Sequence, residues 1–348
     1  MQFLRLQANA SVNCRLAISW LNPLKSADLE VLDRALDWLN DGYQAHLFTV
    51  VKTWGSAPRL PGAVLVVRED GHLIGSVSGG CIEDDLADKA RNRTLPTQPT
   101  IMEYGVSRED AQRFRIPCGG QLQIFVEPLN GVAQLEPIIQ NLRHRKLTKR
   151  SVNISTGEIK LTEVLPEGAP RIEDDWFHTY FGPQWRLLII GANQLGATLA
   201  SMAQALDFDV LVCEPRQEIR DEWHVEGATW VYGMPDDVVL DIAPDAHTAI
   251  VAVTHDPKLD DMALLEALKS DAFYVGALGS HKNQEKRRER LRMFDLSESE
   301  IAIMRGPVGL RIGSRTPAEI AVAILAELIQ VRAQQTTIGL VNQVSCAA

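Results

Sequence analysis

The chain has 348 residues, of which 45% are hydrophobic and 23% charged, an ordinary composition for a soluble globular protein with enough apolar material for two cores. Its formal net charge of −10 gives no electrostatic footprint for a nucleic acid, so we exclude that class of partner. The longest apolar runs, such as residues 318–329, contain glutamates and are too short to span a bilayer.

The N-terminus and the cysteines indicate the compartment. Residues 1–27 have no continuous apolar region and no convincing cleavage site, so we expect a loosely ordered lead-in rather than a signal peptide. Cysteines stand at positions 14, 81, 118, 213 and 346, an odd number without metal-type spacing. This pattern argues against a disulfide framework and a structural zinc site. Reduced thiols are typical of the cytoplasm, which is the location we predict.

The first half of the chain predicts an α+β domain over residues 28–180. Apolar periodicity and turn residues give the following elements in chain order: helix 28–40, strands 45–51, 63–67 and 72–77, helix 83–91, strand 121–127 and a hairpin at Thr156-Gly157. Glu69-Asp70-Gly71 is a strong turn pattern between the second and third strands. We interpret the basic stretch 143–150 as a solvated helix end, with phosphate or partner binding as the alternative.

Two segments of this domain place a cysteine beside two glycines at a strand end: Gly79-Gly80-Cys81-Ile82-Glu83 and Pro117-Cys118-Gly119-Gly120. Glycine lets the backbone take positive φ and approach a ligand closely. We predict that Cys81 and Cys118 face one cavity between strand ends, with Glu83 at its rim. The alternative is that both cysteines are small, buried and unreactive residues at tight turns.

The second half alternates strands and helices, which predicts a doubly wound parallel sheet of the Rossmann type over residues 184–333. Strands are expected at 186–190, 209–213, 248–253 and 272–275, and helices after 191 and over 257–269 and 282–293. The last helix opens on Thr316-Pro317-Ala318-Glu319, a capping box with proline at the first helical position. Residues 334–348 are expected to be a frayed tail.

The turn Gly191-Ala192-Asn193-Gln194-Leu195-Gly196 follows the first of these strands and opens a helix, as in a dinucleotide-binding domain. Gly191 suits the tight turn and Gly196 the close packing of helix on strand. Asn193 stands where a middle glycine would let the backbone approach a pyrophosphate. Glu214 ends the next strand, where an acidic residue would bind a ribose hydroxyl. The pattern predicts the fold and leaves open NAD(P), another phosphate-bearing ligand, or no ligand.

Further candidates lie where such sheets bind ligands, beyond the carboxyl ends of the strands. His255 and Asp256 end one strand, and the turn through Gly279 leads into a basic helix that begins near Lys282. Glycine-rich turns before helices suit anions, and Lys282 and Arg59 are candidate clamps. A solvated helix face with charge pairs is the alternative for the basic helix.

Together these motifs resemble the xanthine dehydrogenase accessory factors of the XdhC/CoxI type. GSAPRLPGA, GSVSGGCIE and PCGGQLQIFVEP resemble their N-terminal part. GANQLG, THDPKLDD, VGALGSHKNQEKRRERL and GPVGLRIGSRTPAEIAVAILAELI resemble their Rossmann part. The chain departs from the family at Asn193, where a second glycine is common, and at Glu214-Pro215-Arg216, whose first position is commonly an aspartate.

The resemblance implies a maturation chaperone with little turnover of its own. Such a factor holds the molybdenum cofactor, protects it from oxidation while a cysteine desulfurase supplies its sulfido ligand, and delivers it to the apo-enzyme of a molybdenum hydroxylase. Here it implies that Cys81 and Cys118, with Glu83, handle sulfur or act as soft ligands of the molybdenum. The implied cofactor-binding residues are Arg59, Gly79, Gly80, Gly119, Gly120, Gly191, Asn193, Gly196, Glu214, His255, Asp256, Gly279 and Lys282. We expect a homodimer.

Two other classes of function stay open. The chain could be an NAD(P)-dependent oxidoreductase that acts through His255 or a cysteine, although the missing middle glycine and the lack of an evident proton-relay pair count against it. It could also be a thiol redox protein in which Cys81 and Cys118 form a disulfide. That interpretation requires their Cα atoms to lie within about 7 Å of each other.

Overall fold

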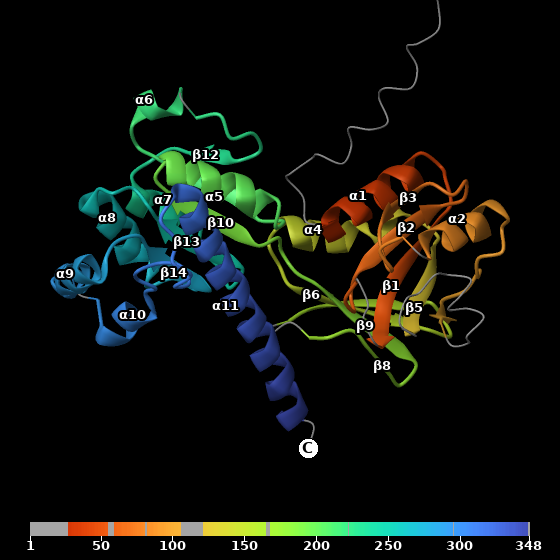
Figure 1. Cartoon of the computed structure of the whole chain (residues 1–348). Coiled ribbons are helices and arrows are strands. Elements are labelled where there is room, and N and C mark those ends of the chain that lie inside the picture. The colour runs from red at the N-terminus through yellow and green to blue at the C-terminus, as the bar shows by residue number, and fades with distance from the viewer. Residues whose placement is uncertain are drawn as a thin grey trace, which may run out of the picture.

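The computed structural model describes residues 27–54, 59–80, 82–105, 121–164, 168–221, 223–294 and 296–346, with side chains described except at residues 27 and 335–346. Figure 1 shows two lobes, an N-terminal one in red to yellow and a C-terminal one in green to blue. Strands in the middle of the chain connect the lobes, and the C-terminal helix projects from the second lobe.

The N-terminal lobe is built on an antiparallel sheet with the strand order β3-β2-β1-β5-β4. Its elements are α1 (Ala27–Asn40), β1 (Ala45–Trp54), β2 (Val64–Arg68), β3 (Leu73–Gly75), α2 (Glu83–Arg91), β4 (Thr100–Tyr104), β5 (Gln121–Leu129), the short 3-10 helix η2 (Val132–Gln134) and α4 (Glu136–Arg143). Consecutive residues of β1 face opposite sides. Leu47 therefore packs under α1 and α4, whereas Phe48 packs under α2.

A second antiparallel sheet, with the order β7-β6-β9-β8, leads from this lobe to the next. Its strands are β6 (Thr148–Asn153), β7 (Ile159–Glu163), β8 (Arg171–Glu173) and β9 (Trp176–Phe181). Arg150 on β6 is 1% exposed and forms a bidentate ion pair with Glu127 on β5, with N–O distances of 2.7 and 2.9 Å. The interpretation of residues 143–150 as a solvated helix end is therefore wrong for Arg150, which joins two sheets.

The C-terminal lobe confirms the predicted doubly wound parallel sheet. All strand pairs are parallel, in the order β12-β11-β10-β13-β14. Its elements are β10 (Arg186–Ile190), α5 (Gln194–Gln204), β11 (Asp209–Cys213), α6 (Gln217–Arg220), β12 (Thr229–Val231), α7 (Pro235–Asp241), β13 (Thr248–Ala252), α8 (Pro257–Ala267), β14 (Tyr274–Ala277), α9 (His281–Arg292), α10 (Glu298–Ile303) and α11 (Pro317–Cys346). Because the strands are parallel, the carboxyl ends of all of them lie at one edge of the sheet.

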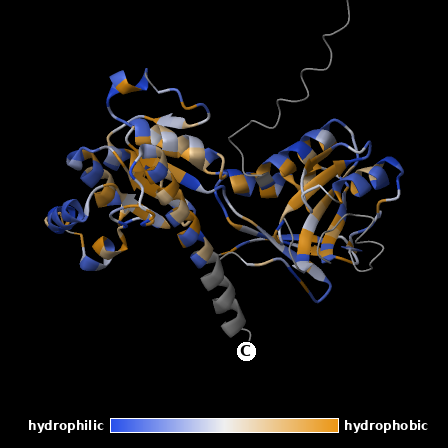
Figure 2. Ribbon diagram, viewed as in Figure 1, coloured by the Kyte–Doolittle hydropathy of each residue, from blue (hydrophilic) through white to orange (hydrophobic). Residues whose placement is uncertain are grey.

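The central strands are apolar because helices cover both faces of the sheet. Every residue of β10 and β13 is buried, and Figure 2 shows the interior of this lobe in orange. Helices α5 and α11 contribute to the core on one face, and α7 to α10 to the core on the other. Arg305 extends the sheet by one bridge, pairing in parallel with Gly276 of β14.

Some elements differ from those expected. The sequence patterns did not predict β4, α4 or β8, and the last helix continues to Cys346 instead of ending before residue 334. The predicted domain boundary near residue 180 falls at the end of β9. Within the described residues, no helix is long and apolar enough to cross a membrane.

Candidate functional site

Glu83 organises the segment that carries the first glycine pair. Its carboxylate receives six hydrogen bonds from the described residues 76–82, three on each oxygen: Ser76 Oγ at 2.6 Å, Val77 N and Ser78 N at 2.9 Å, Ser78 Oγ, Gly80 N at 2.9 Å and Ile82 N at 3.2 Å. The side chain is buried. Burial raises the pKa, but hydrogen bonds from Ser76, Ser78 and the backbone outweigh it and lower the pKa of Glu83 to about 2.

This geometry gives Glu83 a structural role. The buried carboxylate lies beneath the loop and remains ionised at neutral pH. The N–H groups of Gly79 and Gly80 donate to Ser76 Oγ and to Glu83, so neither is available for a phosphate. Gly79 and Gly80 are exposed with φ of +80° and +118°, the left-handed conformation that favours glycine. The protein's own carboxylate thus takes the place of an anionic ligand here.

Cys81, Cys118, Gly119 and Gly120 lie outside the described residues, so the predicted common cavity stays a prediction. The residues that flank them do meet. Tyr104 ends β4, and its hydroxyl donates to Asp85 in the first turn of α2 at 2.9 Å. Tyr104 also pairs with Leu122 at the start of β5. The helix after Cys81 and the strand after Cys118 therefore lie beside the same residue.

The turn after β10 has the geometry of a Rossmann domain. Gly191 has a φ of +112°, and a Cβ there would lie 2.9 Å from the Thr254 backbone. A Cβ on Gly196 would lie 2.2 Å from the carbonyl oxygen of Gly191, so α5 packs directly on the strand end. Both glycines perform the structural roles that the sequence pattern predicts.

The positions that would bind a dinucleotide hold internal contacts instead. Asn193 caps α5, accepting from Gly196 N at 2.9 Å and donating to the Val253 carbonyl. Glu214 is 1% exposed and accepts from Arg216 at 2.7 and 2.8 Å and from Ala192 N at 3.4 Å. The Arg216 and backbone hydrogen bonds lower the pKa of Glu214 against the effect of burial. The described geometry therefore gives no support to NAD(P) as a ligand.

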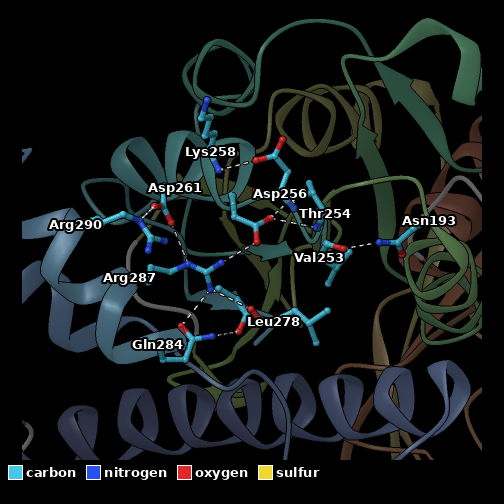
Figure 3. Close-up of polar contacts among 12 residues, drawn as sticks. Asn193, Val253, Thr254, Asp256, Lys258, Asp261, Leu278, Gln284, Arg287 and Arg290 are labelled. Atoms are coloured by element: carbon cyan, nitrogen blue, oxygen red, sulfur yellow. Dashed lines mark hydrogen bonds and ion pairs between the residues drawn. The ribbon is translucent and has the colours of Figure 1, made fainter. Parts of the chain in front are cut away.

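The carboxyl ends of β13 and β14 are tied together by a buried polar network. Asp260 on α8 accepts from Thr254 Oγ1 at 2.8 Å and from Arg287 Nη2 at 2.8 Å. Arg287 on α9 also donates to the Leu278 carbonyl at 3.0 Å. In Figure 3, Arg287 lies between Asp261 on one side and Leu278 and Gln284 on the other. These contacts fix α8 and α9 relative to both strand ends.

A cavity of about 260 Å³ opens at this edge, between the turns after β13 and β14 and the side of α9. His255 and Gly279 line it from the turns, and Asn283, Lys286, Arg287 and Arg290 line it from the helix. His255 has a φ of +67°, a left-handed conformation that histidine adopts more often than most residues other than glycine, and it is exposed. One carboxylate, Asp260, also lines the cavity, but the three cationic side chains of the helix outnumber it and leave a local excess of positive charge.

The cavity contains part of the set of residues predicted from the sequence. His255 and Gly279 line it, as expected of a site at this edge. Asp256 instead caps α8 by accepting from Lys258 N at 2.9 Å. Lys282 is exposed and is not among the lining residues, and Arg59 lies exposed in the loop before β2 of the other lobe. The prediction missed Asn283, Lys286 and Arg290, although their spacing places them on one helix face.

No resident metal site is found in the described part of the chain, where no group of three or more His, Cys, Asp or Glu side chains could hold an ion. Cys213 is free and buried. Burial and the neighbouring Glu214 and Asp236 raise the pKa of its thiol to about 12. Cys213 is therefore an unreactive core residue.

Two family descriptions match the chain. Residues 187–328 match the XdhC Rossmann domain, and residues 38–105 match the XdhC and CoxI family. The chain belongs to the XdhC and CoxI family. These matches confirm the resemblance drawn from the sequence motifs, and they cover the loop organised by Glu83 as well as the cavity beside α9.

Relatives of this XdhC/CoxI-family protein have been named. The molybdenum cofactor insertion chaperone PaoD of Escherichia coli is 28% identical over 307 residues, which are 88% of this chain and 89% of PaoD. A Bacillus subtilis protein, named as a probable subunit of xanthine dehydrogenase, is 26% identical over 320 residues, 84% of this chain and 95% of that protein. A crystal structure from Bacillus halodurans, described as a xanthine dehydrogenase, has a TM-score of 0.69 at 24% identity and covers 89% of this chain and 96% of its own; it shows the shared fold.

Proposed function

We propose that this protein binds the molybdenum cofactor, supports its sulfuration and inserts it into the apo-enzyme of a molybdenum hydroxylase. The name of the E. coli relative, an insertion chaperone for this cofactor, supports the assignment, because that relative aligns over 88% of this chain. The cofactor is cargo here, and it consists of a pterin dithiolene with a phosphate around a thiophilic metal. It therefore needs an anion site at one end and soft ligands at the other.

The contact between Asp85 and Tyr104 is the observation that carries the proposal. It joins the helix that follows Cys81 to the strand pair from which the chain passes to and from Cys118. Two thiols can bind one metal only if the segments that carry them lie close together in space. We assign Cys81 and Cys118 as the soft ligands of the cargo molybdenum, with a cysteine desulfurase as the source of sulfur.

Metal and pterin analysis of the protein purified from cells that make the cofactor tests this assignment. We expect molybdenum and pterin to co-purify with the unmodified chain, and Cys81→Ser and Cys118→Ser each to lose most of the molybdenum. Cys213→Ser is the matched control, because Cys213 is buried in the other lobe and should not affect metal content. Absence of pterin from the unmodified chain, or equal metal in all three variants, would contradict the proposal.

The same preparation discriminates between the other classes of function. A thiol redox protein would show a disulfide between Cys81 and Cys118 that forms and breaks without bound pterin. An oxidoreductase would bind NADH, which the internal contacts of Asn193 and Glu214 argue against. Recovery of a molybdenum hydroxylase by affinity capture would identify the client.

A further inference from the structure

We propose that the cavity beside α9 is a binding site for a phosphate monoester, with Lys286 as its principal cation. The inference goes beyond the proposed function. Figure 1 shows α9 and α2 at opposite ends of the molecule, so a small cofactor does not reach both this cavity and the segments beside Cys81 and Cys118 in one copy of the chain. The sequence predicted anion sites at the glycine turns. The site proposed here lies instead at the side of helix α9.

The side chains of α9 that line the cavity lie on one side of the helix. At about 100° per residue, Asn283, Lys286, Arg287 and Arg290 fall within an arc of roughly 100°. These are the four α9 residues that line the cavity. Glu285 lies about 150° and Glu289 about 110° from the centre of this arc, and neither residue lines the cavity. The helix therefore presents its donors to the cavity and its carboxylates elsewhere.

Charge pairing then distinguishes Lys286 from the two arginines. Arg287 donates to Asp260 at 2.8 Å and to Asp261 at 3.0 Å, and Arg290 donates to Asp261 at 2.5 Å. These two carboxylates balance the two guanidinium groups. Lys286 has no hydrogen bond or ion pair with any described residue in the structure, and it is exposed. One positive charge is thus left for a ligand.

The rigid frame of the site favours a defined ligand. Arg287 is 5% exposed, and its donors are used by Asp260, Asp261, Leu278 and Gln284. It therefore positions α9 and does not itself bind. Asn283 and His255 add polar groups from the helix and from the strand end, so donors approach the cavity from two directions. This arrangement matches the several oxygens of a phosphate.

Cavity size limits the ligand. Sites that enclose a whole drug-sized ligand usually measure about 300 to 1,000 Å³. At about 260 Å³, this cavity holds one polar end of a larger molecule. A protein with a net charge of −10 repels anions at long range, so binding depends on this local site. A phosphate monoester meets both conditions, because its phosphate fits the cavity and the rest of the molecule extends outside it.

Calorimetric titration of the full chain with inorganic phosphate and with a phosphorylated pterin tests the site. Lys286→Ala should weaken the binding of both ligands about tenfold or more, the loss expected for one charge-assisted hydrogen bond. Lys258→Ala is the matched control: Lys258 is an exposed lysine at the start of α8, outside the cavity, and its loss should change binding less than about twofold. Lys282→Ala distinguishes this site from the one predicted at the start of α9, and should behave like the control.

The outcomes separate this site from the proposed function. If Lys286→Ala binds both ligands as tightly as the unmodified chain, or if Lys282→Ala loses as much affinity, the proposal is overturned. If the unmodified chain carries no pterin from cells but binds inorganic phosphate in a Lys286-dependent manner, the site stands and the proposed function fails. If pterin co-purifies equally with the unmodified chain and with Lys286→Ala while phosphate binding depends on Lys286, the function stands and the site binds a phosphate monoester other than the cargo.

Discussion

Glu83 has a structural role that its sequence motif did not indicate. The sequence placed an acid beside a cysteine and two glycines, and predicted a cavity rim. In the structure, six donors of residues 76–82 surround that acid, so the loop folds around a carboxylate of the chain itself. With a pKa near 2, Glu83 does not donate a proton at neutral pH. We infer that it acts on Cys81 only through the shape of the loop.

Replacement of Glu83 by glutamine tests this positioning role. The amide keeps one acceptor oxygen but directs an NH₂ group at three donors, which leaves buried groups unsatisfied. We expect Glu83→Gln to lower the free energy of unfolding by about 2 to 4 kcal/mol in urea denaturation. Asp84→Asn is the control, because Asp84 is exposed and adjacent; its cost should stay below about 1 kcal/mol. Equal costs would contradict the positioning role.

The dependence of the free energy of unfolding on pH, at acidic pH, gives a second prediction for Glu83. The pKa of Glu83 is depressed from 4.5 to about 2 in the folded protein, so its contribution is fully present above pH 4.5. That contribution is lost as the pH falls from about 4.5 towards 2. The loss attributable to Glu83 should be roughly 3 kcal/mol, measured as the difference between the unmodified chain and Glu83→Gln. Parallel pH profiles for the two proteins would show that Glu83 is not the group responsible.

At the scale of elements, packing in the β10–α5 turn and helix propensity predict opposite effects of Gly196→Ala on stability. Alanine favours a helix over glycine by about 1 kcal/mol, so propensity alone predicts that Gly196→Ala stabilises the protein. A Cβ at this position would lie 2.2 Å from the Gly191 carbonyl oxygen, which is backbone and cannot move freely. We therefore expect a loss of about 2 kcal/mol or more in thermal or urea unfolding. A stabilised variant would contradict the direct packing of α5 on the strand end.

The parallel sheet could be predicted because its strands are continuous apolar runs and its turns carry glycine. Strand β8 could not, since it is exposed throughout and leaves no apolar pattern, whereas β7 was predicted only as one arm of the hairpin at Thr156-Gly157. The cavity was only partly predictable. Lys282 and Lys286 are both basic residues of the same helix, and only the packing of α9 decides which one faces the strand ends. Glu127 and Arg150 belong to different sheets, so no local pattern connects them.

At the scale of the molecule, Arg145 joins the two lobes. It follows α4, and its guanidinium donates to both oxygens of Asp245 at 2.8 and 3.1 Å and to the Gln184 carbonyl at 3.2 Å. Asp245 also accepts from Thr248 Oγ1 at the start of β13. These hydrogen bonds lower the pKa of Asp245 to about 2 against the effect of burial, so the ion pair persists at neutral pH. This contact lies at the amino ends of the parallel strands, opposite the cavity.

Loss of this contact should therefore change how the two lobes are held without altering the cavity beside α9. We expect Arg145→Gln to broaden the distribution of lobe orientations in small-angle X-ray scattering, because the bidentate pair constrains the linker at Gln184. The affinity for inorganic phosphate should stay within about twofold, since Lys286 is unaffected. Lys146→Ala is the control, because its pair with Glu163 is exposed and lies within the N-terminal half. If Arg145→Gln and Lys146→Ala give the same scattering profile, the pair between Arg145 and Asp245 does not hold the lobes in place.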